Sequence, residues 1–214
     1  MTCPLCKNQE STSFIGINDI LFWKCPSCYL IYKDQSFHPT PNEEELRYNH
    51  HHNNSECEGY VDSLNQALEP SRNYIDKHMV GLDFGCGPEP VLAKMLEETS
   101  AECYHYDPIF FPELPDERLD FVISTETFEH FSHPSQELNL ITSLLIPSGI
   151  LTVMTHRWKD DTNLADWWYM RDQTHVCFFH DKTFEYICKK YGFSTEYDDG
   201  DKVIILRKII AWEK

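Results

Sequence analysis

The chain has 214 residues, 41% hydrophobic and 14% aromatic, so it can bury one full core with a small appendage and is not disordered throughout. Its 35 acidic and 18 basic side chains give a formal net charge of -17, which argues against a nucleic-acid-binding protein because phosphate backbones are repelled. No apolar stretch approaches the roughly 20 residues that cross a bilayer, and the N-terminal residues lack the apolar segment of a signal peptide. We therefore expect a cytoplasmic protein without a nucleic-acid or membrane partner.

Two C-x-x-C motifs, CPLC and CPSC, lie near the N-terminus and are separated by 18 residues. Zinc prefers four thiolates in a tetrahedron, and each motif offers two sulfurs from one tight turn. Short strands are expected between and after the motifs, over residues 14–19, 20–25 and 29–34. A pair of redox motifs or buried free thiols is the alternative interpretation. The doubled spacing favours a zinc ribbon over residues 1–36, with the metal bound by Cys3, Cys6, Cys25 and Cys28.

Residues 37–79 form a connecting region with helical character. A Pro-rich entry is followed by Asn42 and by acidic residues at 43–45, a pattern typical of a helix N-terminus. Residues 60–76 then show an amphipathic helical pattern that is interrupted near Pro70.

From residue 80 onward the pattern alternates between strands and helices. We expect strands over residues 79–85, 102–107, 119–125 and 149–156. Helices are expected over residues 90–98, 134–146 and 181–192, followed by an antiparallel hairpin around Gly200. Such alternation predicts an α/β fold with a doubly wound, mostly parallel sheet over residues 80–214 and a ligand site at the carboxyl ends of its strands.

The turn after the first of these strands, VGLDFGCGPEP, is compatible with two cofactors. A dinucleotide requires a third small residue for close helix packing and a turn free of negative charge. Here Pro90 takes that third position, and Asp83 would face the pyrophosphate. S-adenosylmethionine (SAM) carries an ammonium and a sulfonium but no phosphate, so an acid is favourable there. Gly85 and Gly87 leave room for the methionine moiety, and Asp107 at the next strand end is placed to accept both ribose hydroxyls.

These segments resemble class I SAM-dependent methyltransferases, specifically small ones with an N-terminal zinc ribbon. LDFGCGPEP is similar to the family's glycine loop, YHYDP to its ribose-binding strand end, and LDFVISTETFEHFSHP to the strand and loop beneath the adenine and sulfonium. LLIPSGILTVMT, RYNHHHNNSECEGY and MRDQTHVCFFHDKTF are similar to further segments of that group. The resemblance implies SAM as cofactor, with contacts from Asp83, Gly85, Cys86, Gly87, Asp107, Pro108, Thr125, Glu126, His51, Asn53 and Tyr60.

Methyl transfer requires an aligned acceptor and, for many acceptors, removal of a proton. We expect His175, in DQTHVCFF, to act as base or to contact the substrate, because imidazole is half neutral near pH 7; tying its loop to backbone carbonyls is the alternative. Glu129 and His130 orient the substrate or cap a helix that begins near Ser132. The segment Trp167 to Tyr169 either lines a substrate pocket or packs in the core.

Two departures from the family pattern leave a second function open. Glu89 replaces the usual third glycine, and only about a dozen residues separate Asp107 from the next strand, too few for a normal crossover with its own helix. One strand and one helix of the usual sheet are therefore expected to be missing. The resemblance implies methylation of an oxygen or carbon atom of a small molecule, such as a sugar or nucleotide sugar. The alternative is a non-catalytic adaptor that docks a partner through its zinc ribbon.

Overall fold

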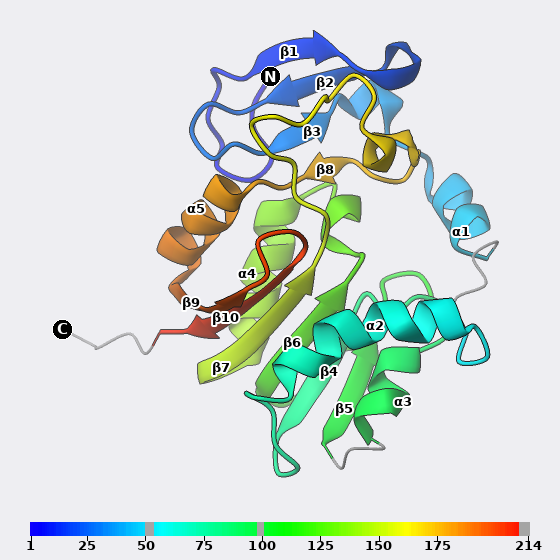
Figure 1. Cartoon of the computed structure of the whole chain (residues 1–214), viewed down its shortest axis with the longest axis vertical. Helices are drawn as coiled ribbons and strands as arrows, with labels where there is room; N and C mark the ends of the chain where they lie inside the picture. The colour runs from blue at the N-terminus through cyan, green and yellow to red at the C-terminus, as the bar shows by residue number, and fades with distance from the viewer. Residues whose placement is uncertain (50–53, 98–100, 210–214) are drawn as a thin grey trace.

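The computed structural model describes residues 1–49, 54–97 and 101–209. It places two sheets one above the other, with the N-terminal sheet at the top of the molecule and the larger core sheet below it (Figure 1). His51 and Asn53, which were predicted to contact the cofactor, lie outside the described residues.

The core sheet has six strands in the order β5-β4-β6-β7-β10-β9. The first four of these run parallel, and β10 is antiparallel to both of its neighbours. Their bounds are β4 Val80–Phe84, β5 Glu102–Tyr106, β6 Leu119–Thr125, β7 Leu145–Met154, β9 Phe193–Asp198 and β10 Val203–Lys208. The predicted mostly parallel sheet and its closing hairpin are therefore confirmed.

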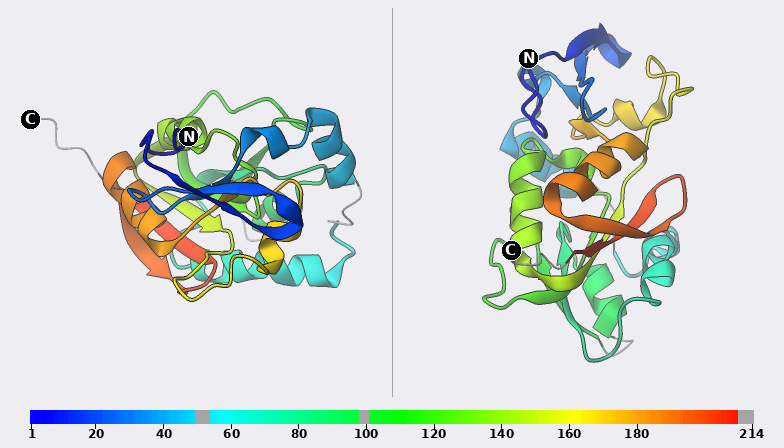
Figure 2. Two further views of the ribbon diagram at one scale, coloured as in Figure 1. Left: turned by 90° about the horizontal axis from the view of Figure 1, so that it is seen from above. Right: turned by 90° about the vertical axis from the view of Figure 1, so that its left-hand side faces the viewer.

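Helices cover both faces of the core sheet, because neighbouring residues of each buried strand point to opposite sides. Phe121 and Ile123 of β6 pack with α2 (Glu58–Ser71) and α3 (Val91–Glu97). Val122, between them, packs with α4 (Pro134–Leu144) and α5 (Asp181–Tyr191). Figure 2 shows these helices on opposite sides of the sheet. None of the helices in the described ranges combines the length and apolar character of a membrane span.

The connection between β5 and β6 contains neither a helix nor a strand. Asp107 and Phe111 form an isolated bridge there, and β5 is left at the edge of the sheet. The expected loss of one strand and one helix is confirmed. Because that strand is missing, no strand in the described residues covers the outer edge of β5.

The N-terminal sheet has four strands in the order β1-β2-β3-β8, all antiparallel. The sequence predicted three of them: β1 (Thr12–Ile15), β2 (Leu21–Lys24) and β3 (Ile31–Lys33). The first strand was expected over residues 14–19, but residues 17–19 form a 3-10 turn instead. The fourth, β8 (Cys177–Phe178), comes from the range assigned to the core. The N-terminal sheet therefore shares a strand with the segment that carries His175.

A buried lysine strengthens this connection. Lys33 has 1% of its surface exposed, and its Nζ donates to the carbonyl of Gln173 at 2.8 Å. Its backbone N–H donates to the carbonyl of Val176 at 2.9 Å. The segment just before β8 is thus fixed by the N-terminal sheet.

The remaining elements are short. The helix α1 (Pro41–Asn49) and the 3-10 turns η1 (Ile17–Asp19) and η2 (Gln35–Phe37) lie in the first 49 residues. Two further 3-10 turns, η3 (Phe128–His130) and η4 (Trp168–Arg171), follow β6 and β7 respectively.

Candidate functional site

A cavity of about 560 Å³ lies at the carboxyl ends of β4, β5, β6 and β7. This volume is typical of small-molecule sites, and the position is where open α/β sheets bind ligands. Its wall comes from the loops after these strands, from the helices α1, α2 and α4, and from the loop before β8. Of the residues predicted to bind the cofactor, the wall contains Gly85, Cys86, Gly87, Asp107, Pro108, Thr125, Glu126 and Tyr60.

The two glycines of the loop after β4 are required for different reasons. Both have left-handed backbone angles, with φ of 85° at Gly85 and 66° at Gly87. A Cβ on Gly85 would lie 2.2 Å from the side chain of Thr127, whereas a Cβ on Gly87 would meet nothing within 4 Å. Both glycines were expected to leave room for the methionine moiety. Only Gly87 does so, because it faces open space, whereas Gly85 is needed for the close approach of Thr127.

Asp107 connects the glycine loop to the loop after β5. Its Oδ2 accepts from the backbone N–H of Gly87 at 3.1 Å, and its Oδ1 accepts from the N–H groups of Ile109 and Phe110 at 2.9 and 3.1 Å. A carboxylate oxygen can accept more than one hydrogen bond. The carboxylate therefore organises the cavity wall and keeps acceptor capacity for a ligand.

Asp83 is not on the cavity wall but directly beneath it. Its side chain is only 3% exposed, and burial raises its pKa to about 7, with the charge of Asp107 adding to the effect. Any influence on a ligand must therefore act through the electric field rather than through contact. Glu89, the residue that departs from the family pattern, is exposed and also lies off the wall.

Glu126 occupies a strained position at the end of β6, with φ of 48°. Burial, followed by the negative charge of Glu129, raises the pKa of Glu126 to about 8. The hydroxyl of Tyr169 donates to Glu126 Oε2 at 3.2 Å. Thr155 Oγ1 lies 3.3 Å from that hydroxyl and donates to Glu129 Oε2 at 2.8 Å. Two acidic side chains therefore share one buried polar network at the cavity.

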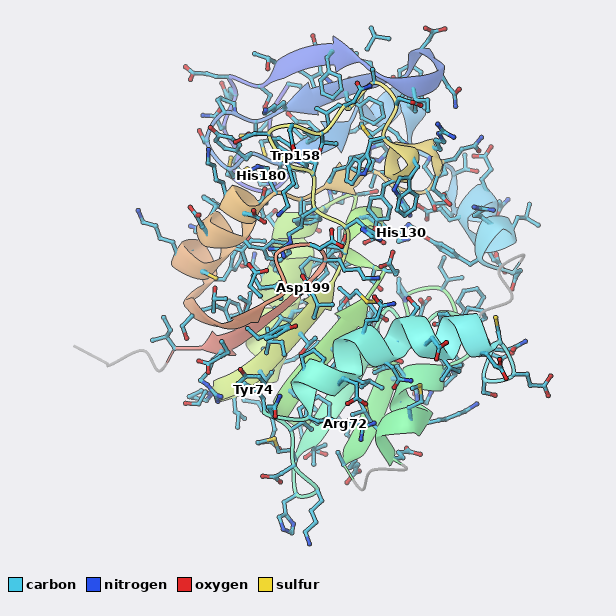
Figure 3. The ribbon with its side chains drawn as sticks, in the orientation of Figure 1. Arg72, Tyr74, His130, Trp158, His180 and Asp199 are labelled. Carbon is cyan, nitrogen blue, oxygen red and sulfur yellow. The ribbon has the colours of Figure 1, made fainter. Side chains whose placement is uncertain are left out.

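His130 and His175 stand side by side in the cavity wall, with ring centres 4.9 Å apart. His130 Nδ1 lies 3.1 Å from the carbonyl of Thr174, and His175 Nδ1 lies 2.8 Å from the carbonyl of Tyr169. Because a carbonyl only accepts, Nδ1 carries the proton in both rings, and Nε2 keeps a free lone pair. Figure 3 shows His130 near the end of the core sheet that faces the N-terminal sheet.

Burial lowers the pKa of His130 to about 4 and that of His175 to about 3. The expectation that His175 is half protonated near pH 7 is therefore wrong: removal from water disfavours the imidazolium. Glu129 and His130 do not cap a helix at Ser132 either. Both lie in η3, whereas α4 begins at Pro134. The N-cap of α4 is His133, which makes no side-chain capping hydrogen bond.

Several wall residues were missed by the sequence reasoning. Glu44 and Tyr48 of α1 and Ser63 and Leu64 of α2 face the cavity, as do Glu137 of α4 and Asp172. The amphipathic pattern of residues 60–76 marks one apolar helix face without saying what that face covers. The segments RYNHHHNNSECEGY and MRDQTHVCFFHDKTF, which contain Tyr48 and Asp172, were the other available signal. Trp167, Trp168 and Tyr169 do not line the cavity.

The four N-terminal cysteines converge in the turns beside the N-terminal sheet. Their sulfur atoms all lie within 4.8 Å of one another, with 3.6 Å between Cys3 and Cys28 and 3.4 Å between Cys6 and Cys25. Sulfurs on a tetrahedral zinc ion are about 3.8 Å apart, given zinc–sulfur bonds of about 2.3 Å. The cluster is therefore compatible with a structural zinc ion.

Comparison with known proteins identifies the fold and family. A methyltransferase domain model matches residues 48–197 of the chain. No curated protein matches it. A SAM-dependent methyltransferase from Aquifex aeolicus has a similar structure, with a TM-score of 0.52 and 14% identity over 80% of this chain and all of that one.

Two further solved structures are similar. An O-methyltransferase family protein from Burkholderia thailandensis gives a TM-score of 0.53 and 14% identity, covering 84% of this chain and 66% of that one. The mitomycin 7-O-methyltransferase gives a TM-score of 0.52 and 15% identity, covering 81% and 60%. Identities this low relate the folds alone. The family model, which matches more than half of the chain, shows that the protein belongs to the methyltransferase domain family, and the solved structures show the α/β methyltransferase fold.

Proposed function

We propose that the protein is a SAM-dependent methyltransferase that acts on an oxygen or carbon atom of an uncharged small molecule such as a sugar. The observation that carries the proposal is the charge of the cavity wall. Among the described residues it contains five acidic side chains and no Lys or Arg. Of these acids, Asp172 pairs with Arg47 at 2.7 Å, and Glu126 has a pKa raised to about 8. A cationic cofactor is stabilised in such a cavity, whereas a pyrophosphate is repelled.

The chain's own residues suit SAM. Gly87 leaves open space beside the loop after β4, and Asp107 offers carboxylate oxygens to a ribose. Glu126 and Tyr60 lie where negative charge and an aromatic ring can face a sulfonium. When bound, SAM supplies an electrophilic methyl group. The protein's task is then to orient the acceptor and to exclude water.

The acceptor side of the cavity is assigned to His175 and His130. Both imidazoles are neutral, and in the absence of a metal ion each keeps an unprotonated Nε2 that can accept a hydrogen bond from a hydroxyl. Glu126, with its pKa raised to about 8, is the acid of the cavity wall whose protonation changes near neutral pH, as that of Asp83 does beneath the wall. The acidic wall disfavours a diphosphate, so a nucleotide sugar would have to keep its phosphates outside the cavity.

The N-terminal cluster is proposed to hold a structural zinc ion through its four cysteines. Residues 1–36 remain our proposed ribbon, 37–79 the helical region over the cofactor and 80–214 the catalytic core. A non-catalytic adaptor gains no support, because the cavity is formed and the glycines and Asp107 lie on its wall.

Calorimetric titration tests the proposal directly. SAM and its demethylated product should bind with one site per chain, and NAD and ATP should not. NAD binding in the absence of SAM binding would mean that the glycine loop serves a dinucleotide. The absence of binding by any of the four ligands would favour the adaptor.

A further inference from the structure

The two histidines of the cavity wall belong to a larger donor cluster. One nitrogen of His130, one nitrogen of His175 and one carboxylate oxygen of Glu129 lie within 4.8 Å of one another. Apart from the four cysteines, this is the cluster in the described residues whose donors are close enough for a metal ion. We propose that these three residues form a second metal site, which binds a divalent transition-metal ion such as Zn²⁺, Co²⁺ or Fe²⁺.

The histidines are oriented as metal ligands are. A metal-binding imidazole almost always donates its other N–H to a backbone carbonyl or a carboxylate, which fixes the ring and its tautomer. Both Nδ1 atoms here donate to backbone carbonyls, at 3.1 and 2.8 Å, which leaves Nε2 as the available donor. Two imidazoles on one ion have ring centres about 5 Å apart, given metal–nitrogen bonds of about 2.1 Å. The observed separation of 4.9 Å matches this arrangement.

Glu129 supplies the second, independent observation. Its side chain is completely buried, with 0% exposed, yet its Oε1 has no hydrogen-bond partner among the described residues. Oε2 is used, because it accepts from Thr155. Within the described residues, no Lys or Arg forms an ion pair with Glu129. A buried carboxylate oxygen with neither donor nor counter-ion is costly, and a metal ion provides both the bond and the charge.

The donor set selects the type of metal. Two imidazoles and one carboxylate suit borderline transition metals, in contrast to the all-oxygen sites of Mg²⁺ and Ca²⁺. Three protein ligands leave open coordination positions. Because His130 and His175 line the cavity, those positions face the space that we assign to the acceptor. This role for the acceptor rests on the proposed function, but binding of the metal does not.

Cobalt titration of the purified zinc-containing protein tests the site. The zinc already present keeps the four cysteines occupied, so Co²⁺ reports the second site. One equivalent should bind, with the weak visible bands of nitrogen and oxygen coordination and without intense sulfur-to-cobalt charge-transfer bands. The His130→Gln/His175→Gln variant should lose binding at least 100-fold, and Glu129→Gln at least tenfold.

A matched control comes from the same cavity. His133 lines the cavity but lies outside the donor cluster, so His133→Gln should bind Co²⁺ as tightly as the wild type. Thermal unfolding and the ribbon zinc content show whether each variant is folded. No Co²⁺ binding by the wild type, equal binding by the double variant, or thiolate-type bands would each overturn the proposal. SAM affinity, measured in parallel, tests the proposed function separately.

Discussion

The Oδ2 atom of Asp107 accepts a hydrogen bond from the backbone N–H of Gly87, at 3.1 Å. One carboxylate at the end of β5 thereby holds the glycine loop at the end of β4. The two loops that are proposed to bind the ribose and the methionine moiety of SAM are thus linked before any ligand arrives.

The first prediction concerns this link. Asp107→Ala should weaken binding of SAM by about 2–3 kcal/mol, because ribose hydroxyls lose a charged acceptor and the glycine loop loses its anchor. The demethylated product, which keeps the ribose, should lose the same amount in calorimetric titrations. A loss confined to SAM would instead place Asp107 near the sulfonium.

A second prediction separates the two glycines. Gly85→Ala should reduce the free energy of unfolding by about 2–4 kcal/mol, since a left-handed residue and a clash with Thr127 are combined. Gly87→Ala should cost about 1 kcal/mol of stability, for its backbone angle alone, but should lower SAM affinity at least tenfold. Urea denaturation and calorimetry measure the two quantities. Equal stability losses would contradict the assigned clash.

The third prediction is a pH dependence of SAM binding. The pKa of Glu126 is raised to about 8 and that of Asp83 to about 7, so both acids are largely protonated below those values. A bound cation favours the ionised carboxylates and therefore lowers both pKa values. SAM affinity should rise with pH, by up to about tenfold per pH unit for each proton released.

Calorimetry in buffers with different ionisation enthalpies counts the protons released. The measurement uses protein without added divalent metal, because a nearby metal ion would also lower these pKa values. Glu126→Gln removes one titrating group and should flatten the profile. A profile that stays unchanged in this variant would assign the effect to Asp83 or to another acid.

A fourth prediction concerns His175. His175→Ala should lower turnover by roughly 10²–10⁴-fold and leave SAM affinity nearly unchanged, because the residue is assigned to the acceptor side. Since the pKa of His175 is lowered to about 3, its protonation should give no step in the rate near pH 6.5. Full activity in both His175→Ala and His175→Gln would remove His175 from the site and leave His130 as the candidate.

The fifth prediction tests the N-terminal metal. Elemental analysis should find one equivalent of zinc that disappears in the Cys25→Ser/Cys28→Ser variant. The matched control is Cys57→Ser/Cys188→Ser, which changes two cysteines outside the cluster and should keep the metal. Zinc retained without Cys25 and Cys28 would refute this ligand set.

The sequence predicted what depends on local pattern. Buried strands such as Val80–Phe84, the glycine loop after that strand and the paired C-x-x-C motifs each leave a signal within a few residues. Contacts between distant segments leave no such signal. Cys177 pairs with Tyr32, 145 positions away, and Gly85 lies close against Thr127, 42 positions away. Only the folded chain reveals these contacts.

The pKa of His175 was unpredictable for the same reason. The ordinary pKa of histidine applies to an imidazole in water. Burial, and then the neighbouring His130, lower the pKa of His175 to about 3, so the ring is neutral rather than half protonated near pH 7. Likewise, the acidic wall of the cavity is assembled from α1, α4 and the loops after β5 and β6, together with Asp172. An overall charge of -17 does not indicate where the acids gather.

The shared strand β8 limits how this protein can be divided or recombined. A catalytic fragment cut at residue 36 would expose the hydrogen-bonding edge of β8, which β3 covers in the intact chain. Such an edge invites pairing with other chains. A ribbon taken from another enzyme would fit only if its last strand matched Cys177 and Phe178 in register. The two parts are therefore expected to be inherited, exchanged and engineered as one unit.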